Sequence, residues 1–189
     1  MKRNLGALPA VFPMPVLMVA AYDDKGRVGI MNAAWGMMCG MDKIALCISE
    51  GHKTTKNIRL NRAFTVALAD ADHMAESDFF GIATGNTMPD KFNKSGMTAV
   101  RSLYVNAPVI TEYPVTMECE LLEVVDSENL HAVVGRIVNV AAEESVLDEE
   151  GKIDVSKLNA LIFDQFRSGY YLLGEQAGQA WDAGIRLTK

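Results

Sequence analysis

Residues 31–58 bring together side chains of the types that bind a phosphate-bearing cofactor. The run begins with Asn32-Ala33-Ala34-Trp35, where small residues surround one flat aromatic ring. It ends with Ser49-Glu50-Gly51-His52-Lys53-Thr54-Thr55, which offers hydroxyls, a cation and backbone N–H groups where a helix should begin. A helix N-terminus has unpaired N–H groups and a partial positive charge, so it attracts phosphate. The alternative is an ordinary capped helix, with Thr54 or Thr55 as its N-cap.

Short apolar runs separated by turn residues are the elements that would position these groups. We expect strands at 15–22, 28–34, 44–48, 64–69, 115–125, 132–140 and 161–163. We expect helices at 54–61, 73–84 and 90–95, an acidic excursion at 139–151, and a Gly- and Ala-rich tail from 170 that covers a site or a partner subunit. Six or seven strands with few helices favour a mainly β fold, a closed antiparallel barrel with helical inserts, because closure removes exposed edges.

The composition is that of one soluble globular domain: 189 residues, 49% of them hydrophobic and 22% charged. A net charge of −6 argues against a nucleic-acid or anionic-membrane partner, since either would need a basic surface. No run approaches the ~20 apolar residues of a membrane-spanning helix. Lys2 and Arg3 precede apolar residues, but three prolines interrupt these, so we expect no cleaved signal peptide.

The cysteines and histidines show no metal-binding pattern. Cys39, Cys47 and Cys119 are odd in number and lack CxxC spacing, which argues against disulfides or a zinc site and favours a reducing cytoplasm. We expect all three to be small buried residues; the alternative is a reactive thiol. The three histidines are scattered along the chain, so no metal is predicted.

Five short motifs follow one another over residues 15–174 and carry a family resemblance. They are Asn32-Ala33-Ala34-Trp35, the polar turn Ser49 to Thr55 with Asn57-Ile58, Thr84-Gly85 with Asp90-Lys91-Phe92, His131 with Gly135, and Tyr170-Tyr171-Leu172-Leu173-Gly174. In this order they resemble the flavin reductase-like family of FMN-binding split barrels, which includes the flavoredoxins. The chain departs from the family pattern in three places. Gly40-Met41-Asp42-Lys43 stands where prolines often follow the Asn-Ala strand, Lys53 stands where Arg is common, and Leu130 stands where an Asp often precedes the histidine.

The resemblance implies a Greek-key split barrel of six to seven antiparallel strands, and a homodimer with FMN at the subunit boundary. It implies that His131 modulates the redox step beside the flavin ring; the alternative is a structural histidine. For Trp35 the alternative is a core residue on a plain strand, and for Asp90 to Phe92 it is a helix cap, a surface charge and a core ring. The implied cofactor-binding residues are Asn32, Ala33, Ala34, Trp35, Ser49, His52, Lys53, Thr54, Thr55, Asn57, Asp90, Lys91 and Phe92.

The resemblance also implies an oxidoreductase that passes electrons from NADH or NADPH through bound FMN to free flavin or a protein acceptor. The cofactor supplies the hard chemistry, while the protein supplies orientation and electrostatics. The chain has no GxGxxG fingerprint, so a nicotinamide would stack on the flavin rather than occupy a Rossmann domain. Two alternatives stay open: a flavoredoxin-type electron carrier without a fast nicotinamide reaction, and a non-catalytic flavin-binding or ligand-binding protein.

Overall fold

A computed structural model describes residues 1–188, and a seven-stranded antiparallel sheet forms its centre. The strand order is β3-β2-β6-β9-β10-β5-β4. The strands are β2 (Leu17–Tyr22), β3 (Val28–Ala33), β4 (Gly36–Gly40), β5 (Lys43–Leu46), β6 (Ala63–Leu68), β9 (Val115–Ser127) and β10 (Leu130–Ala142).

The two edges of this sheet meet at Ala34 and Trp35. Strands β3 and β4 lie at opposite ends of the strand order, yet only these two residues separate them in the chain. The sheet must therefore curl until the end of β3 reaches the start of β4, although no hydrogen-bond ladder joins these two strands within residues 1–188. The Trp35 carbonyl accepts a hydrogen bond of 2.7 Å from the backbone N–H of Cys47, just beyond β5. The mainly β antiparallel barrel predicted from the sequence is confirmed, and we call the junction at residues 34–35 the barrel seam.

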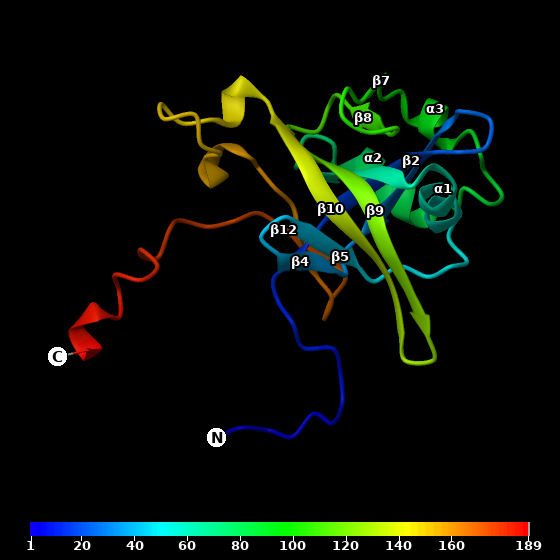
Figure 1. The fold of residues 1–189 in the computed structure, drawn as a ribbon. Helices are drawn as coiled ribbons and strands as arrows, with labels where there is room; N and C mark the ends of the chain where they lie inside the picture. The colour runs from blue at the N-terminus through cyan, green and yellow to red at the C-terminus, as the bar shows by residue number, and fades with distance from the viewer. Residues whose placement is uncertain (189) are drawn as a thin grey trace.

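Smaller elements surround the barrel. The strands β1 (Met14–Pro15), β11 (Ile162–Asp164) and β12 (Gly169–Tyr171) form one sheet, and β7 (Ala99–Arg101) pairs with β8 (Pro108–Ile110). The helices are α1 (Lys53–Asn61), α2 (Met74–Ile82) and α3 (Lys91–Ser95), with 3-10 turns at Glu144–Val146, Val155–Lys157 and Ile185–Leu187. The long β9–β10 hairpin runs past the barrel, and both chain ends extend away from it (Figure 1).

Two apolar clusters lie on the two faces of β2, because successive side chains of a strand point to opposite faces. Leu17 and Val19 face the barrel interior, together with Phe64. Met18 and Ala20 face outward, where Phe80 of α2 covers them. Both faces are buried, so residues 15–22 form a continuous apolar run rather than an alternating one. Inside the barrel, Gly135 of β10 lies directly against the Phe64 ring.

The structure corrects several expected elements. Strands β4, β7, β8 and β12 lie outside the strands expected from the sequence. The start of the expected excursion at 139–151 belongs to β10, which continues to Ala142. No helix among residues 1–188 is long and apolar enough to cross a membrane.

The prediction of three buried cysteines is wrong for two of them. Cys39 is exposed on the edge strand β4, and Cys47 is exposed beside the barrel seam. Cys119 alone fits the prediction: it is fully buried in the barrel interior. That burial, with a smaller contribution from the neighbouring Glu118 carboxylate, raises the pKa of the Cys119 thiol to about 12.

Candidate functional site

A cleft of about 330 Å³ opens where the barrel seam, the start of α1 and the end of α2 meet. Each of these three places leaves backbone groups outside the regular hydrogen-bond ladders, so polar groups converge there. The cleft is lined by Met31, Asn32, Ala33, Ala34, Trp35, Cys47, Ile48, His52, Lys53, Thr54, Phe80, Gly81, Ala83, Thr84, Gly85 and Lys91.

The charge of the cleft opposes that of the whole chain. Its described lining carries two lysines, Lys53 and Lys91, together with His52, and no carboxylate. The chain as a whole has 24 acidic residues and a net charge of −6. A cleft of one sign concentrates ligands of the opposite sign. The cleft is therefore suited to an anion.

The start of α1 is open to a ligand. Its N-cap residue, His52, makes no side-chain capping bond, and no acidic residue lies in the first turn. Neither Thr54 nor Thr55 is the N-cap, so the capped-helix alternative is wrong in that respect. The Thr55 hydroxyl instead donates to the Ser49 carbonyl at 2.8 Å and fixes the preceding turn. Backbone N–H groups at an uncapped helix start suit a phosphate.

Lys53 is the first residue of α1 and lines the cleft. Its Nζ lies 3.6 Å from Oδ1 of Asp24, on the β2–β3 turn. Its stem packs against Gly85, where an added Cβ would lie 3.3 Å from the Lys53 Cβ. The absence of a side chain at Gly85 therefore lets the lysine and the backbone after α2 approach each other closely.

Lys91 is a buried cation, only 4% exposed. Its Nζ donates hydrogen bonds to the carbonyls of Phe80 at 2.8 Å and Ala83 at 2.6 Å, at the C-terminal end of α2. Among residues 1–188 it forms no ion pair, and burial lowers the pKa of its ammonium group to about 8. A buried charge without an opposite charge is costly. This arrangement favours an anionic ligand beside Lys91.

The opposite end of the cleft, at the barrel seam, is flatter and less charged. The Trp35 side chain is 56% exposed, which leaves an aromatic face open to solvent. Asn32 donates from Nδ2 to the Ser77 carbonyl at 3.1 Å and also contacts the Tyr170 hydroxyl. The Tyr170 hydroxyl donates to Asp78 at 2.8 Å, and burial together with this carboxylate raises the pKa of Tyr170 to about 12. The tyrosine thereby helps to hold Asn32 in place.

The structure brings part of the predicted site together. Ser49 and Thr55 do not line the cleft but hold the turn before α1 through their hydrogen bond. Asn57 is buried in α1, and its Nδ2 has no partner within residues 1–188. Asp90 is exposed, and Phe92 stacks on Phe80 in the core. His131 stands apart, exposed near the end of the β9–β10 hairpin. The predicted residues that line the cleft are Asn32, Ala33, Ala34, Trp35, His52, Lys53, Thr54 and Lys91.

The wall of the cleft made by α2 was not predicted as part of the site. The motif Thr84-Gly85 is the one signal in the sequence that this wall takes part. The lining residues missed are Met31, Cys47, Ile48, Phe80, Gly81 and Ala83. They are apolar, small or sulfur-bearing, and such residues are as common in cores as in sites.

Comparison with known proteins identifies the class of fold. Residues 9–169 match the flavin reductase like domain, so the chain belongs to the flavin reductase-like family. Its structure is similar to the flavoredoxin of Desulfovibrio vulgaris (Miyazaki F), with a TM-score of 0.92 and 32% identity, covering 97% of this chain and 100% of that chain. A flavoredoxin from Methanosarcina acetivorans shares the fold, with a TM-score of 0.89 at 23% identity and 99% coverage of both chains.

A further relative is an uncharacterized protein of Aeropyrum pernix. It is 29% identical over 134 residues, which make up 70% of this chain and 51% of that protein. The chain thus spans about half the length of this relative. The family predicted from the sequence motifs is confirmed.

Proposed function

We propose that the protein binds FMN in the cleft, with the phosphate at the start of α1 and the ring at the barrel seam. The observation that carries this proposal is the distribution of charge. Lys53, Thr54, Gly85 and Lys91 line both the cleft and a small adjoining recess of about 20 Å³, so both lysines lie at one end. Asp23 also lines the recess, and its carboxylate is paired with Arg27. The exposed Trp35 face lies at the seam, outside that recess.

The residues present fit this cofactor. Lys53 and the uncapped helix start would hold the phosphate by charge-assisted hydrogen bonds. The phosphate would supply the negative charge that the buried Lys91 ammonium lacks within residues 1–188. Asn32 and the backbone at Ala33 and Ala34 would orient the polar edge of the ring, where donors tune its electronics.

We further propose that the protein is an FMN-dependent oxidoreductase that takes electrons from NADH or NADPH and delivers them to free flavin or a redox protein. Bound FMN supplies hydride and one-electron transfer at its ring. The family membership supports this activity. The alternative is an electron carrier without a fast nicotinamide reaction, and the likeness to a flavoredoxin at 32% identity favours it.

We also propose that the protein is a homodimer whose second subunit covers the outer side of the seam. The support is the apolar surface of β4 and its turn, where Met37 is 71% exposed and Met41 is 100% exposed. Strand β4 is also an edge of the sheet, and an edge strand offers backbone groups for pairing. An apolar patch of this kind beside a site is typical of an interface.

Two measurements test the proposal in turn. The purified protein is titrated with FMN and with riboflavin, and binding is followed by flavin absorbance and by quenching of tryptophan fluorescence. Tighter binding of FMN is expected; equal affinity for both ligands would refute the phosphate site. The FMN-loaded protein is then mixed anaerobically with NADH or NADPH in a stopped-flow instrument. Fast bleaching identifies a reductase, and slow bleaching with rapid reduction by dithionite identifies a carrier.

A further inference from the structure

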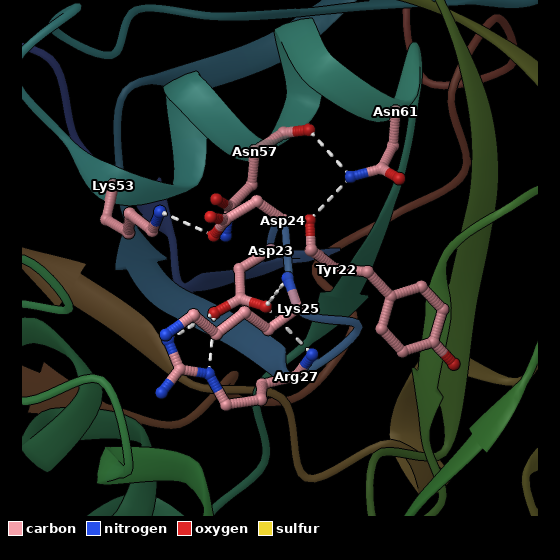
Figure 2. Close-up of polar contacts among 8 residues, drawn as sticks. All are labelled: Tyr22, Asp23, Asp24, Lys25, Arg27, Lys53, Asn57 and Asn61. Carbon is pink, nitrogen blue, oxygen red and sulfur yellow. Dashed lines mark hydrogen bonds and ion pairs between the residues drawn. The ribbon is translucent and has the colours of Figure 1, made fainter.

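The turn between β2 and β3 is held rigid by Asp23. The buried Asp23 carboxylate accepts hydrogen bonds from the backbone N–H groups of Lys25 at 2.8 Å and Arg27 at 2.9 Å. It also accepts one from the Arg27 Nε at 2.8 Å (Figure 2). These bonds lower the pKa of Asp23 although burial alone would raise it. The carboxylate is therefore satisfied within its own turn and fixes the course of the backbone through Asp24.

The same turn is attached to α1. The Asn61 side chain donates from Nδ2 to the Tyr22 carbonyl at 2.6 Å and to the Asn57 carbonyl at 3.1 Å. Figure 2 shows Asn61 bridging the helix and the strand end in this way. The turn and the helix consequently form one unit, and the position of Asp24 relative to the start of α1 is set by the fold.

Asp24 faces the lysine at that helix start. Its Oδ1 lies 3.6 Å from Lys53 Nζ, and its side chain is 62% exposed (Figure 2). Within residues 1–188 the Asp24 side chain makes no hydrogen bond that would fix or neutralise it otherwise. At this distance the two groups attract each other without close hydrogen-bond contact. The lysine that lines the cleft therefore has a carboxylate competing for it.

We propose that Asp24 is an affinity-determining residue that weakens binding of the phosphate-bearing flavin by competing for Lys53 and by repelling the phosphate. This inference rests on the proposed phosphate site at Lys53. A neutral flavin without phosphate experiences neither effect. Asp24 therefore reduces the difference in binding affinity between FMN and riboflavin. It also makes bound FMN exchange more readily than it would with Lys53 alone.

The test is a double-mutant cycle on the full chain, with dissociation constants for FMN and riboflavin measured by fluorescence quenching at low salt. Asp24→Asn is expected to lower the dissociation constant for FMN by about 2- to 10-fold, the scale of an exposed ion pair with added repulsion. The dissociation constant for riboflavin should not change. In the Lys53→Ala background, Asp24→Asn should increase FMN affinity by a smaller factor, because only the repulsion between Asp24 and the phosphate is then removed. Added salt should reduce the gain in both backgrounds.

Glu149→Gln is the matched control, because it removes the same charge from an exposed turn away from the cleft. An equal gain in FMN affinity in this control would show a net-charge effect and overturn the assignment of Asp24. Unchanged FMN affinity in Asp24→Asn, when Lys53→Ala still weakens FMN, would overturn the role of Asp24 and leave the phosphate site standing. If Lys53→Ala leaves FMN affinity unchanged, the proposed phosphate site fails, and this inference fails with it.

Discussion

The Nδ1 atom of His131 lies 2.6 Å from Oδ1 of Asp126, its partner directly across the β9–β10 hairpin. The acid that the sequence did not place beside this histidine is therefore supplied by the neighbouring strand. A carboxylate that accepts from Nδ1–H fixes the tautomer and leaves Nε2 as the unprotonated nitrogen of the neutral ring.

His131 does not line the cleft of its own chain, so an effect on flavin reduction requires the proposed dimer to bring the β9–β10 hairpin to the partner's cleft. On that proposal we expect His131 to modulate flavin reduction without being essential. His131→Ala should slow reduction by NADH about 10- to 100-fold, toward the low end for a positioned proton donor, with FMN still bound. Asp126→Asn should have a smaller effect, since it keeps the ring in place but removes the charge. A lower melting temperature with an unchanged bleaching rate per bound flavin would assign the pair a structural role.

Lys53→Ala should weaken FMN binding by about 1.5–3 kcal/mol, the scale of a hydrogen bond to a charged group, and leave riboflavin binding nearly unchanged. Isothermal titration with both ligands measures the difference. Lys56→Ala is the control, because Lys56 is exposed on the same helix and does not line the cleft. Similar losses in the two variants would argue against a direct contact between Lys53 and the phosphate.

Lys91 makes the stability of the flavin-free protein depend on pH. Its folded-state pKa of about 8 lies below the ordinary lysine value of 10.5, so between these values the unfolded chain binds more protons. The contribution of Lys91 to the free energy of unfolding therefore increases as the pH rises from about 8 to 10.5. Urea unfolding should show wild type gaining about 1–2 kcal/mol relative to Lys91→Met between pH 7 and 9.5. A constant difference across this range would contradict the assignment.

Gly135 is a packing requirement of the barrel. A Cβ at this position would lie 2.4 Å from Cζ of Phe64 and 3.3 Å from Cβ of Cys119. Gly135→Ala should therefore lower the free energy of unfolding by about 1–3 kcal/mol, as overpacking of a core does. Gly178→Ala, where nothing lies within 4 Å, should stay within about 0.5 kcal/mol of wild type. Equal denaturation midpoints for the two variants would count against this explanation.

The proposed dimer is tested by light scattering of the FMN-loaded protein. The mass should be about twice the 20.6 kDa of one chain. Met37→Glu should shift the protein toward monomer, because it places a charge on the apolar edge strand β4. Leu103→Glu is the control on another exposed apolar residue, outside β4. A mass of 20.6 kDa for the wild type would refute the dimer.

The barrel strands were largely predictable because their residues are apolar over a length that suits a strand. Residues 15–22 and 115–125 correspond to β2 and to most of β9. Strand β4 was not predictable from the sequence, because Gly-Met-Met-Cys-Gly has neither alternating polar and apolar residues nor β-branched residues. It is a strand because β5 pairs with it, which is a tertiary effect.

The candidate site was predictable only where its groups are local in sequence. Lys53 and Thr54 stand at a helix start, and Asn32 stands near a strand end, so pattern and chemistry coincide there. The contribution of Phe80 and Gly81 depends on how α2 packs against β3, and no short spacing encodes that. The acid for His131 was missed for a similar reason: the hairpin register pairs residues 131 and 126, not immediate neighbours.

The barrel seam has a consequence for how the chain folds during synthesis. Strands β2 and β3 join the sheet through β6, whereas β4 and β5 join it through β10, where Ile44 pairs with Gly135. A nascent chain that ends before Val115 lacks both strands that separate β6 from β5. The two sides of the seam then have no ladder to hold them together, and the cleft has no fixed shape. We therefore expect the proposed cofactor to bind only after the β9–β10 hairpin has left the ribosome.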